Sequence, residues 1–254
     1  MKAKLFACDI DNTLIYSRRR PHEGFRCVEW IQGEEQAYMS PGTIALLRRR
    51  SAEMLFVPVT SRSIAQYGRI RFPDGCAPEW AVVANGAVLL HRGEMDGDWA
   101  QRTGEILSPW RRELTRMRAL LCADERFARC RIVDEAYVFI KCDDGVAAQA
   151  ATEALSEETE LDVIAAGRKI YLLPPGIDKA CAVQRLRERF DCGDLICAGD
   201  SNMDLPMLRI ADCAIMPEAL REKWRGHGQC IAWNSDEPFS EFALSRGLDW
   251  MNRS

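Results

Sequence analysis

Two carboxylates separated by a single residue, Asp9 and Asp11, are the side chains of this sequence best placed to do chemistry. They follow residues 5–8, a short apolar run typical of a strand buried on both faces of a parallel sheet. Ligands of open α/β sheets bind at the carboxyl ends of the strands, so both acids are expected at a binding edge. Two carboxylates this close repel each other, which raises a pKa unless a cation or hydrogen-bond donors compensate. The pair therefore predicts a divalent metal, although strand-end acids also serve as caps or turn formers.

A second acidic pair, Asp200 and Asp204, follows another short apolar segment, residues 195–198. Gly199 precedes the first acid and allows close approach of the backbone, and acids four residues apart share one side of the following turn. Mg²⁺ prefers a few carboxylate ligands together with water and phosphate oxygens. These residues are therefore a second candidate part of a hard-cation site.

Two further residues stand where they could bind an anion. Thr60 ends the apolar segment 53–59, and a hydroxyl just before a helix can bind a phosphate oxygen beside free backbone N–H groups. Lys179 follows Asp178, a potential helix cap, which places the lysine in the first helical turn. Its ammonium would offset the charge of a phosphate and of Asp9. A helix cap at Thr60 and a surface lysine remain the ordinary structural alternatives.

These residues, taken in order, resemble the motifs of the haloacid dehalogenase (HAD) superfamily, most of whose members are phosphatases. Residues 9–13 read DxDxT, Thr60 matches the strand-end hydroxyl of the second motif, and residues 199–204 read GDxxxD. The sequence Ala-Asn-Gly-Ala at 84–87 is similar to the segment at which the chain of one subgroup passes from the core into a cap domain. That subgroup includes the Cof-type sugar phosphatases, sucrose phosphatase and phosphomannomutase.

One position departs from the resemblance. Relatives in this subgroup usually carry Asn immediately before the second acid of the last motif, whereas this sequence has Met203 there and Asn202 one residue earlier. Asn202 is therefore at best a substitute for the usual contact with substrate phosphate.

The resemblance implies phosphoryl transfer in two steps with Mg²⁺ as the cofactor. Asp9 would attack phosphorus to form an aspartyl-phosphate, while Asp11 would protonate the leaving oxygen and then deprotonate the attacking water. The implied catalytic residues are Asp9, Asp11, Thr60 and Lys179. The implied metal-binding residues are Asp9, Asp11 through its backbone carbonyl, Asp200 and Asp204, the last of which would orient metal-bound water. The implied substrate- and phosphate-binding residues are Asn12, Ser61, Arg62, Asn85, Gly86 and Asn202.

The hydrophobic pattern and the resemblance together predict an α/β fold, with a doubly wound, Rossmann-like parallel-sheet core and a smaller inserted α+β cap. We assign residues 1–85 and 175–254 to the core and 86–174 to the cap. The cap pattern predicts a helix at 108–122, a strand at 130–142, a helix at 146–159 and a strand-rich segment at 161–173.

Two features near the predicted site have an open role. Alternating residues around Gly33 predict a β-hairpin over 27–39, which would hang over the strand-end acids either as a flap that screens the site from water or as decoration. Basic residues of the cap either face the cleft and bind an anionic substrate or lie on the surface. They are Arg111, Arg112, Arg116, Arg118, Arg168 and Lys169.

The composition argues against several other classes of protein. A formal charge of −4 gives no global attraction to nucleic acid or anionic membranes. No apolar run approaches the roughly 18 residues of a membrane span, and the apolar part of the N-terminal segment is too short for a signal peptide. Eleven cysteines without a CxxC pair are typical of a reducing compartment rather than of a disulfide framework or zinc site. We therefore expect a cytoplasmic protein.

These observations predict a magnesium-dependent phosphatase that hydrolyses a small phosphomonoester, such as a sugar phosphate, as a monomer or homodimer. Two alternatives stay open. In a phosphomutase or phosphotransferase of the same superfamily, the phosphoryl group would pass to a sugar hydroxyl instead of water. A catalytically silent protein would only bind a phosphorylated metabolite, but the intact pair of Asp9 and Asp11 argues against it.

Overall fold

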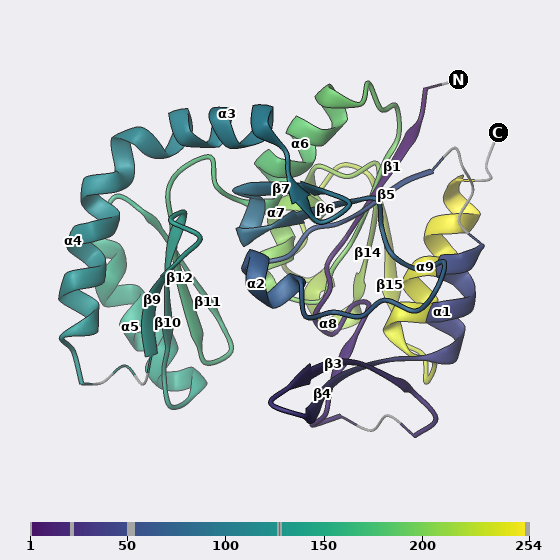
Figure 1. Cartoon of the computed structure of the whole chain (residues 1–254), viewed down its shortest axis with the longest axis horizontal. Helices are drawn as coiled ribbons and strands as arrows, with labels where there is room; N and C mark the ends of the chain where they lie inside the picture. The colour runs from purple at the N-terminus through teal and green to yellow at the C-terminus, as the bar shows by residue number, and fades with distance from the viewer. Residues whose placement is uncertain (1, 21–22, 50–53, 126, 128, 252–254) are drawn as a thin grey trace.

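The computed structural model describes residues 2–20, 23–49, 54–125, 127 and 129–251. Its central sheet has the strand order β15-β14-β13-β1-β5, and all neighbouring strands run parallel (Figure 1). This arrangement confirms the predicted parallel-sheet core. The strands of the sheet are β1 (Lys4–Cys8), β5 (Met54–Pro58), β13 (Leu195–Ala198), β14 (Cys213–Pro217) and β15 (Gln229–Trp233).

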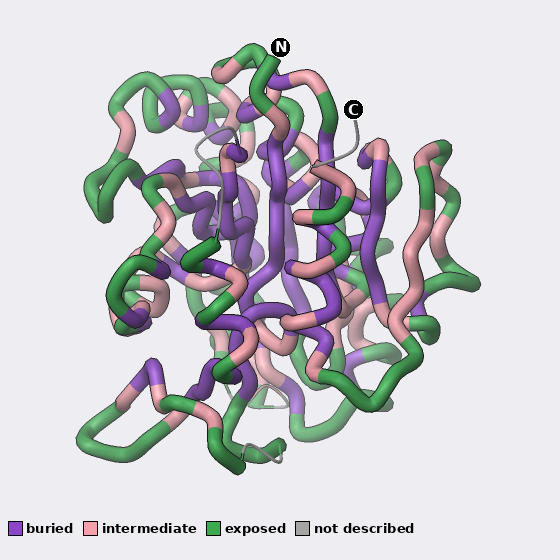
Figure 2. Tube along the Cα trace, turned by 90° about the vertical axis from the view of Figure 1, so that its right-hand side faces the viewer, coloured by how far each residue is buried: buried purple, intermediate pink, exposed green. Residues whose placement is uncertain are grey.

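Helices cover both faces of this sheet, because successive side chains of each strand point to opposite sides. On β1, Phe6 and Cys8 face one hydrophobic cluster while Leu5 and Ala7 face another. Figure 2 shows the resulting buried strands at the centre of the molecule. The first face is covered by α1 (Pro41–Arg48) and α9 (Phe239–Met251), and the second by α6 (Lys179–Arg189), α7 (Leu205–Arg209) and α8 (Glu218–Arg221).

A small antiparallel sheet, β6 (Trp80–Val83), β7 (Val88–His91) and β8 (Glu94–Met95), lies beside β5. Its strands β7 and β8 fall within residues 86–174, which the sequence assigned to the cap, and that division stays a prediction. The short α2 (Ile64–Tyr67) connects β5 to it, and Val59 and Val82 form a parallel bridge between them. Between β6 and β7 lies the turn η1 (Ala84–Gly86), where Asn85 has φ +55° and Gly86 has φ +110°. The Asn-Gly pair thus forms a tight turn between the two strands.

The cap is built on a separate antiparallel sheet with the order β11-β12-β10-β9. Its elements are α3 (Gly97–Leu107), η2 (Ser108–Trp110), α4 (Arg111–Cys122), β9 (Arg129–Val133), β10 (Tyr137–Lys141), α5 (Gly145–Glu158), β11 (Asp162–Ala166) and β12 (Lys169–Leu173). Figure 1 shows α3 leading from the core to α4.

Two details of the cap differ from the sequence prediction. The single strand predicted over 130–142 is wrong: it is the hairpin of β9 and β10, which turns at Asp134 and Glu135, both with positive φ. The helix α3 was not predicted, because its polar sequence offers only Trp99, Thr103 and Leu107 as buried residues.

The predicted hairpin over 27–39 is confirmed as β3 (Arg26–Ile31) and β4 (Glu34–Met39), with β2 (Tyr16–Ser17) alongside β4. We call β2, β3 and β4 the flap. Tyr16 anchors it to α9, since its hydroxyl accepts a hydrogen bond from Ser240 N at 2.8 Å. In the described ranges, no helix combines the length and hydrophobicity needed to cross a bilayer.

Candidate active site

Asp9 stands directly after β1, where its backbone N–H donates to the Ala198 carbonyl of the neighbouring strand at 2.9 Å. Its buried carboxylate accepts a hydrogen bond from Lys179 Nζ at 2.6 Å. Lys179 is the first residue of α6, which Asp178 caps as predicted. Burial alone would lower the pKa of the Lys179 ammonium, but Asp204 and Asp9 raise it, so this lysine is a permanent cation beside Asp9.

Asp204 organises the loop that follows β13. Its fully buried Oδ2 accepts hydrogen bonds from the N–H groups of Asp200 (3.1 Å) and Ser201 (2.9 Å) and from the Ser201 hydroxyl (2.8 Å), while Oδ1 accepts from Lys179 at 2.5 Å. Gly199 makes this turn possible, because an added Cβ would lie 2.4 Å from the Cβ of Asp204. The loop thereby places Asp200 beside Asp9.

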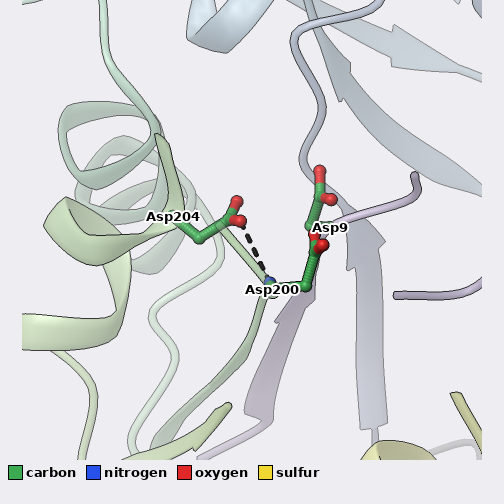
Figure 3. A group of neighbouring side chains, drawn as sticks. All are labelled: Asp9, Asp200 and Asp204. Atoms are coloured by element: carbon green, nitrogen blue, oxygen red, sulfur yellow. Dashed lines mark hydrogen bonds between the residues drawn. The ribbon is translucent and has the colours of Figure 1, made fainter. Parts of the chain in front are cut away.

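The carboxylates of Asp9, Asp200 and Asp204 converge, with one oxygen of each lying within 4.8 Å of the others (Figure 3). Lys179 offsets only part of their negative charge. Burial, followed by the charge of Asp204, raises the pKa of Asp200 to about 7. Burial also raises the pKa of Asp9, and the opposing charge of Lys179 does not cancel this effect. A hard cation would relieve the repulsion, so the oxygen donors fit a divalent metal such as Mg²⁺.

Asp11 is held differently from Asp9. Its carboxylate is 47% exposed and accepts two hydrogen bonds of 2.8 Å from the Arg62 guanidinium. The buried Glu29 of the flap accepts from the same guanidinium at 2.9 Å and from Arg69 Nε at 3.0 Å. Burial raises the pKa of Asp11, but the hydrogen bond and charge of Arg62 outweigh it and lower that pKa. Asp11 is therefore a carboxylate at neutral pH, and Arg62 ties it to the flap.

These acids surround a cavity of about 420 Å³, a size that suits a small metabolite. We call it the first cavity. The described residues that line it come from the ends of β1, β5 and β13, from α6 and α8, and from the cap: Asp9, Asp11, Asn12, Ser61, Ala166, Gly167, Lys169, Tyr171, Lys179, Asp200, Ser201, Asn202, Met203 and Leu220.

Solved structures share this architecture over nearly the whole chain. The sucrose-phosphatase from Synechocystis sp. PCC6803, solved with sucrose and phosphate, has 18% sequence identity and a TM-score of 0.64, covering 98% of this chain and 99% of its own. A haloacid dehalogenase-like hydrolase from B. subtilis has 18% identity and a TM-score of 0.63, covering 97% and 99%. A sugar phosphatase of HAD subclass IIB has 13% identity and a TM-score of 0.64, covering 98% of each chain.

The chain has the haloacid dehalogenase-like fold. No protein-family model matches the sequence, and no curated protein matches it significantly.

Within this HAD-like fold, most of the predicted site residues lie together. Asp9, Asp11, Lys179 and Asp200 line the first cavity with Asn12, Ser61 and Asn202. The Asn202 side chain accepts a hydrogen bond from Lys223 Nζ at 3.2 Å. Met203, which replaces the expected Asn, is 5% exposed and belongs to the hydrophobic cluster of the cap. Whether Asn202 contacts phosphate stays a prediction.

Five predicted site residues lie outside the described wall of the first cavity: Thr60, Arg62, Asn85, Gly86 and Asp204. Thr60 is buried, and its Oγ1 accepts from Arg62 N at 3.2 Å. Asn85 Nδ2 donates to the Ile177 carbonyl at 3.3 Å, which joins the turn between β6 and β7 to the segment that precedes α6. Gly86 packs against α6, where an added Cβ would lie 2.8 Å from the carbonyl oxygen of Asp178. Asn85 and Gly86 thus hold this turn against the start of α6.

Of the basic cap residues, Lys169 is the one that lines the first cavity. Arg116 pairs with Glu113 on its own helix at 2.7 Å, and Arg168 donates to the Asp143 carbonyl at 3.2 Å. Arg111 and Arg118 line a separate groove on the cap.

Sequence reasoning missed the partners of Arg62. Glu29 is 33 residues away from Arg62 in the chain. Arg69, which binds Glu29 in turn, is 40 residues away from Glu29. The one available signal was an acid within the predicted hairpin strand, next to the apolar Val28.

Proposed function

We propose that this chain is a phosphatase of the HAD superfamily that hydrolyses a small phosphomonoester, of the sugar-phosphate type, with Mg²⁺ as cofactor. The observation that carries the proposal is the buried Asp9 carboxylate, which contacts the cation Lys179 at 2.6 Å and opens onto a cavity of about 420 Å³. The fold shared with sucrose-phosphatase and other sugar phosphatases supports it.

In the proposed reaction, an Asp9 oxygen attacks phosphorus while the bond between phosphorus and the leaving oxygen breaks. Asp11 takes up a proton from solvent when the substrate binds and gives it to that oxygen, and a water then loses a proton to the Asp11 carboxylate as it attacks the aspartyl-phosphate. Arg62 favours the ionised form of Asp11, which suits its second role as base. Lys179 stabilises the negative charge that Asp9 shares with the phosphoryl group.

Asp9 and Asp200 would hold the metal directly, together with the backbone carbonyl of Asp11. Asp204 supports them, because its hydrogen bonds fix the loop that carries Asp200. When bound, Mg²⁺ would supply positive charge to the oxygens of the transferring group. The cavity supports a small phosphorylated metabolite as the ligand. Free thiols at all eleven cysteines accord with the cytoplasmic location that we predict.

The test is phosphate release from p-nitrophenyl phosphate and from a panel of phosphorylated sugars, each with Mg²⁺ or with EDTA. We expect Mg²⁺-dependent turnover by the wild type and a loss of at least about a thousandfold in Asp9→Asn, since the amide is no nucleophile. Turnover by Asp9→Asn, or none by the wild type, would contradict the proposal. Supplying a sugar bisphosphate and analysing for isomerised monophosphate separates hydrolysis from mutase activity.

A further inference from the structure

A second cavity, of about 280 Å³, lies on the other side of Asp11. Three parts of the molecule form its wall: the flap, the helix α2 of the core and the cap sheet. The flap contributes Glu29, Ile31 and Gln36, α2 contributes Gln66, and the cap contributes Arg131, Tyr137 and Phe139. It is therefore enclosed by segments that are far apart in the sequence and that meet only in the folded chain.

The second cavity adjoins the first. Asp11, Ser61, Lys169 and Tyr171 line both of them. In the proposed function, Asp11 protonates the leaving oxygen, so the ester bond that breaks lies next to it. With the phosphoryl group at Asp9 in the first cavity, the alcohol part of the ester extends past Asp11 into the second.

Cations outnumber anions in the second cavity. Its acids are Asp11 and Glu29, and both are already paired, Asp11 with Arg62, and Glu29 with Arg62 and Arg69. Two further cations, Arg131 and Lys169, have no ion pair with a carboxylate in the described part of the chain, although the charge of Lys169 acts on Asp11 at longer range. The wall therefore carries positive charge for which the described residues supply no close anion.

Arg131 is exposed, but two contacts position its guanidinium. Its Nη2 donates to Gln66 Oε1 across the gap between cap and core at 3.2 Å, and its guanidinium lies 5.5 Å from the centre of the Phe139 ring. Phe139 in turn packs edge to face on Tyr171 at 5.6 Å. Ring faces of this kind pack well on the C–H groups of a sugar, and a guanidinium beside them pairs with an anion.

We propose that the alcohol part of the substrate carries a second anionic group, a carboxylate or a second phosphate, which Arg131 and Lys169 bind in the second cavity. This inference rests on the proposed function and names its substrate class: a sugar-sized phosphomonoester with a negative charge at the end remote from the scissile phosphate.

The test compares matched substrates that differ at the remote end. Fructose 6-phosphate is paired with fructose 1,6-bisphosphate, and glucose 6-phosphate with 6-phosphogluconate, so the two pairs distinguish a phosphate from a carboxylate. We expect the wild type to show a kcat/KM at least about fivefold higher for the doubly anionic member of one pair or both. Arg131→Gln should reduce that ratio to near one, whereas Arg131→Lys should retain most of it.

Arg129→Gln is the matched control, because Arg129 lies two residues away on β9, is exposed, and stands outside the described wall of either cavity. It should leave both the ratio and the hydrolysis of p-nitrophenyl phosphate unchanged. Each ratio is measured within one enzyme, so partial misfolding of a variant cancels.

A wild-type ratio near one in both pairs, or a ratio that Arg131→Gln leaves intact, would overturn the inference while hydrolysis of p-nitrophenyl phosphate still upheld the proposed function. If the wild type hydrolyses no ester at all, the proposed function fails and the inference falls with it.

Discussion

Replacing Asp200 by Asn is expected to stabilise the metal-free protein and to abolish its response to Mg²⁺. Asp200 lies beside Asp9 and Asp204, and its pKa in the folded chain is raised from 3.8 to about 7. The folded chain therefore binds this proton more tightly than the unfolded chain. Stability then falls as the pH rises from about 4 to about 7, and the penalty is complete above that range.

The size of the effect follows from the shift. About 3 pKa units at roughly 1.4 kcal/mol each set an upper bound near 4 kcal/mol at pH 8. We expect about 2 kcal/mol, because Asp200 is only partly buried and shares its repulsion with neighbouring acids. For a chain of this size, that corresponds to a rise in Tm of about 4 to 8 °C.

The assay is thermal unfolding of wild type and Asp200→Asn in EDTA at pH 5 and pH 8, repeated at pH 8 with Mg²⁺. The variant should gain about two fifths as much stability at pH 5 as at pH 8. Only the wild type should gain from Mg²⁺. Asp98→Asn is the control, since the Asp98 side chain is 91% exposed and should change the stability by less than about 0.5 kcal/mol. A variant less stable than wild type at pH 8 in EDTA, or an equal response of both proteins to Mg²⁺, would refute the reasoning.

Two further substitutions probe the contacts that link the flap and the cap to the core. Glu29→Gln removes a carboxylate that is only 4% exposed and that pairs with two arginines. We expect it to lower the free energy of unfolding, measured by urea denaturation, by about 2 kcal/mol. An unchanged value would mean that these ion pairs of the flap contribute nothing to stability. Tyr137→Phe deletes the 2.6 Å hydrogen bond from the cap to the Ser61 carbonyl. Without it, the arrangement in which the cap contacts the core is less favourable, so KM in steady-state kinetics should rise about fivefold. A loss of kcat at constant KM would argue against that role.

The chemistry-bearing core of the site was predictable because it depends on local rules. Each acid follows a short buried strand, and parallel strands bring their carboxyl ends to one edge of the sheet. Asp9 and Asp200 therefore meet although 190 residues separate them, and Lys179 joins them from a helix start with a recognisable cap.

The remaining contacts were not predictable, because they depend on tertiary packing. Arg62 has the expected position after β5, but its guanidinium donates to Asp11 and to Glu29 of the flap, which is distant in the sequence. Asn85 lies in a turn, and only the fold reveals that its amide donates a hydrogen bond to the carbonyl of Ile177, which lies 92 residues later in the chain. The helix α3 was not predicted either, although its buried residues Trp99, Thr103 and Leu107 recur at helical spacing.

The most direct measurement of the central proposal is rapid acid quenching of the wild type during turnover of radiolabelled p-nitrophenyl phosphate, followed by peptide mapping. We predict label on the peptide that contains Asp9, sensitive to hydroxylamine as an acyl phosphate is, and none in Asp9→Asn. Steady turnover without protein-bound label at the earliest quench times, or label on a different residue, would contradict the assignment of Asp9 as the nucleophile.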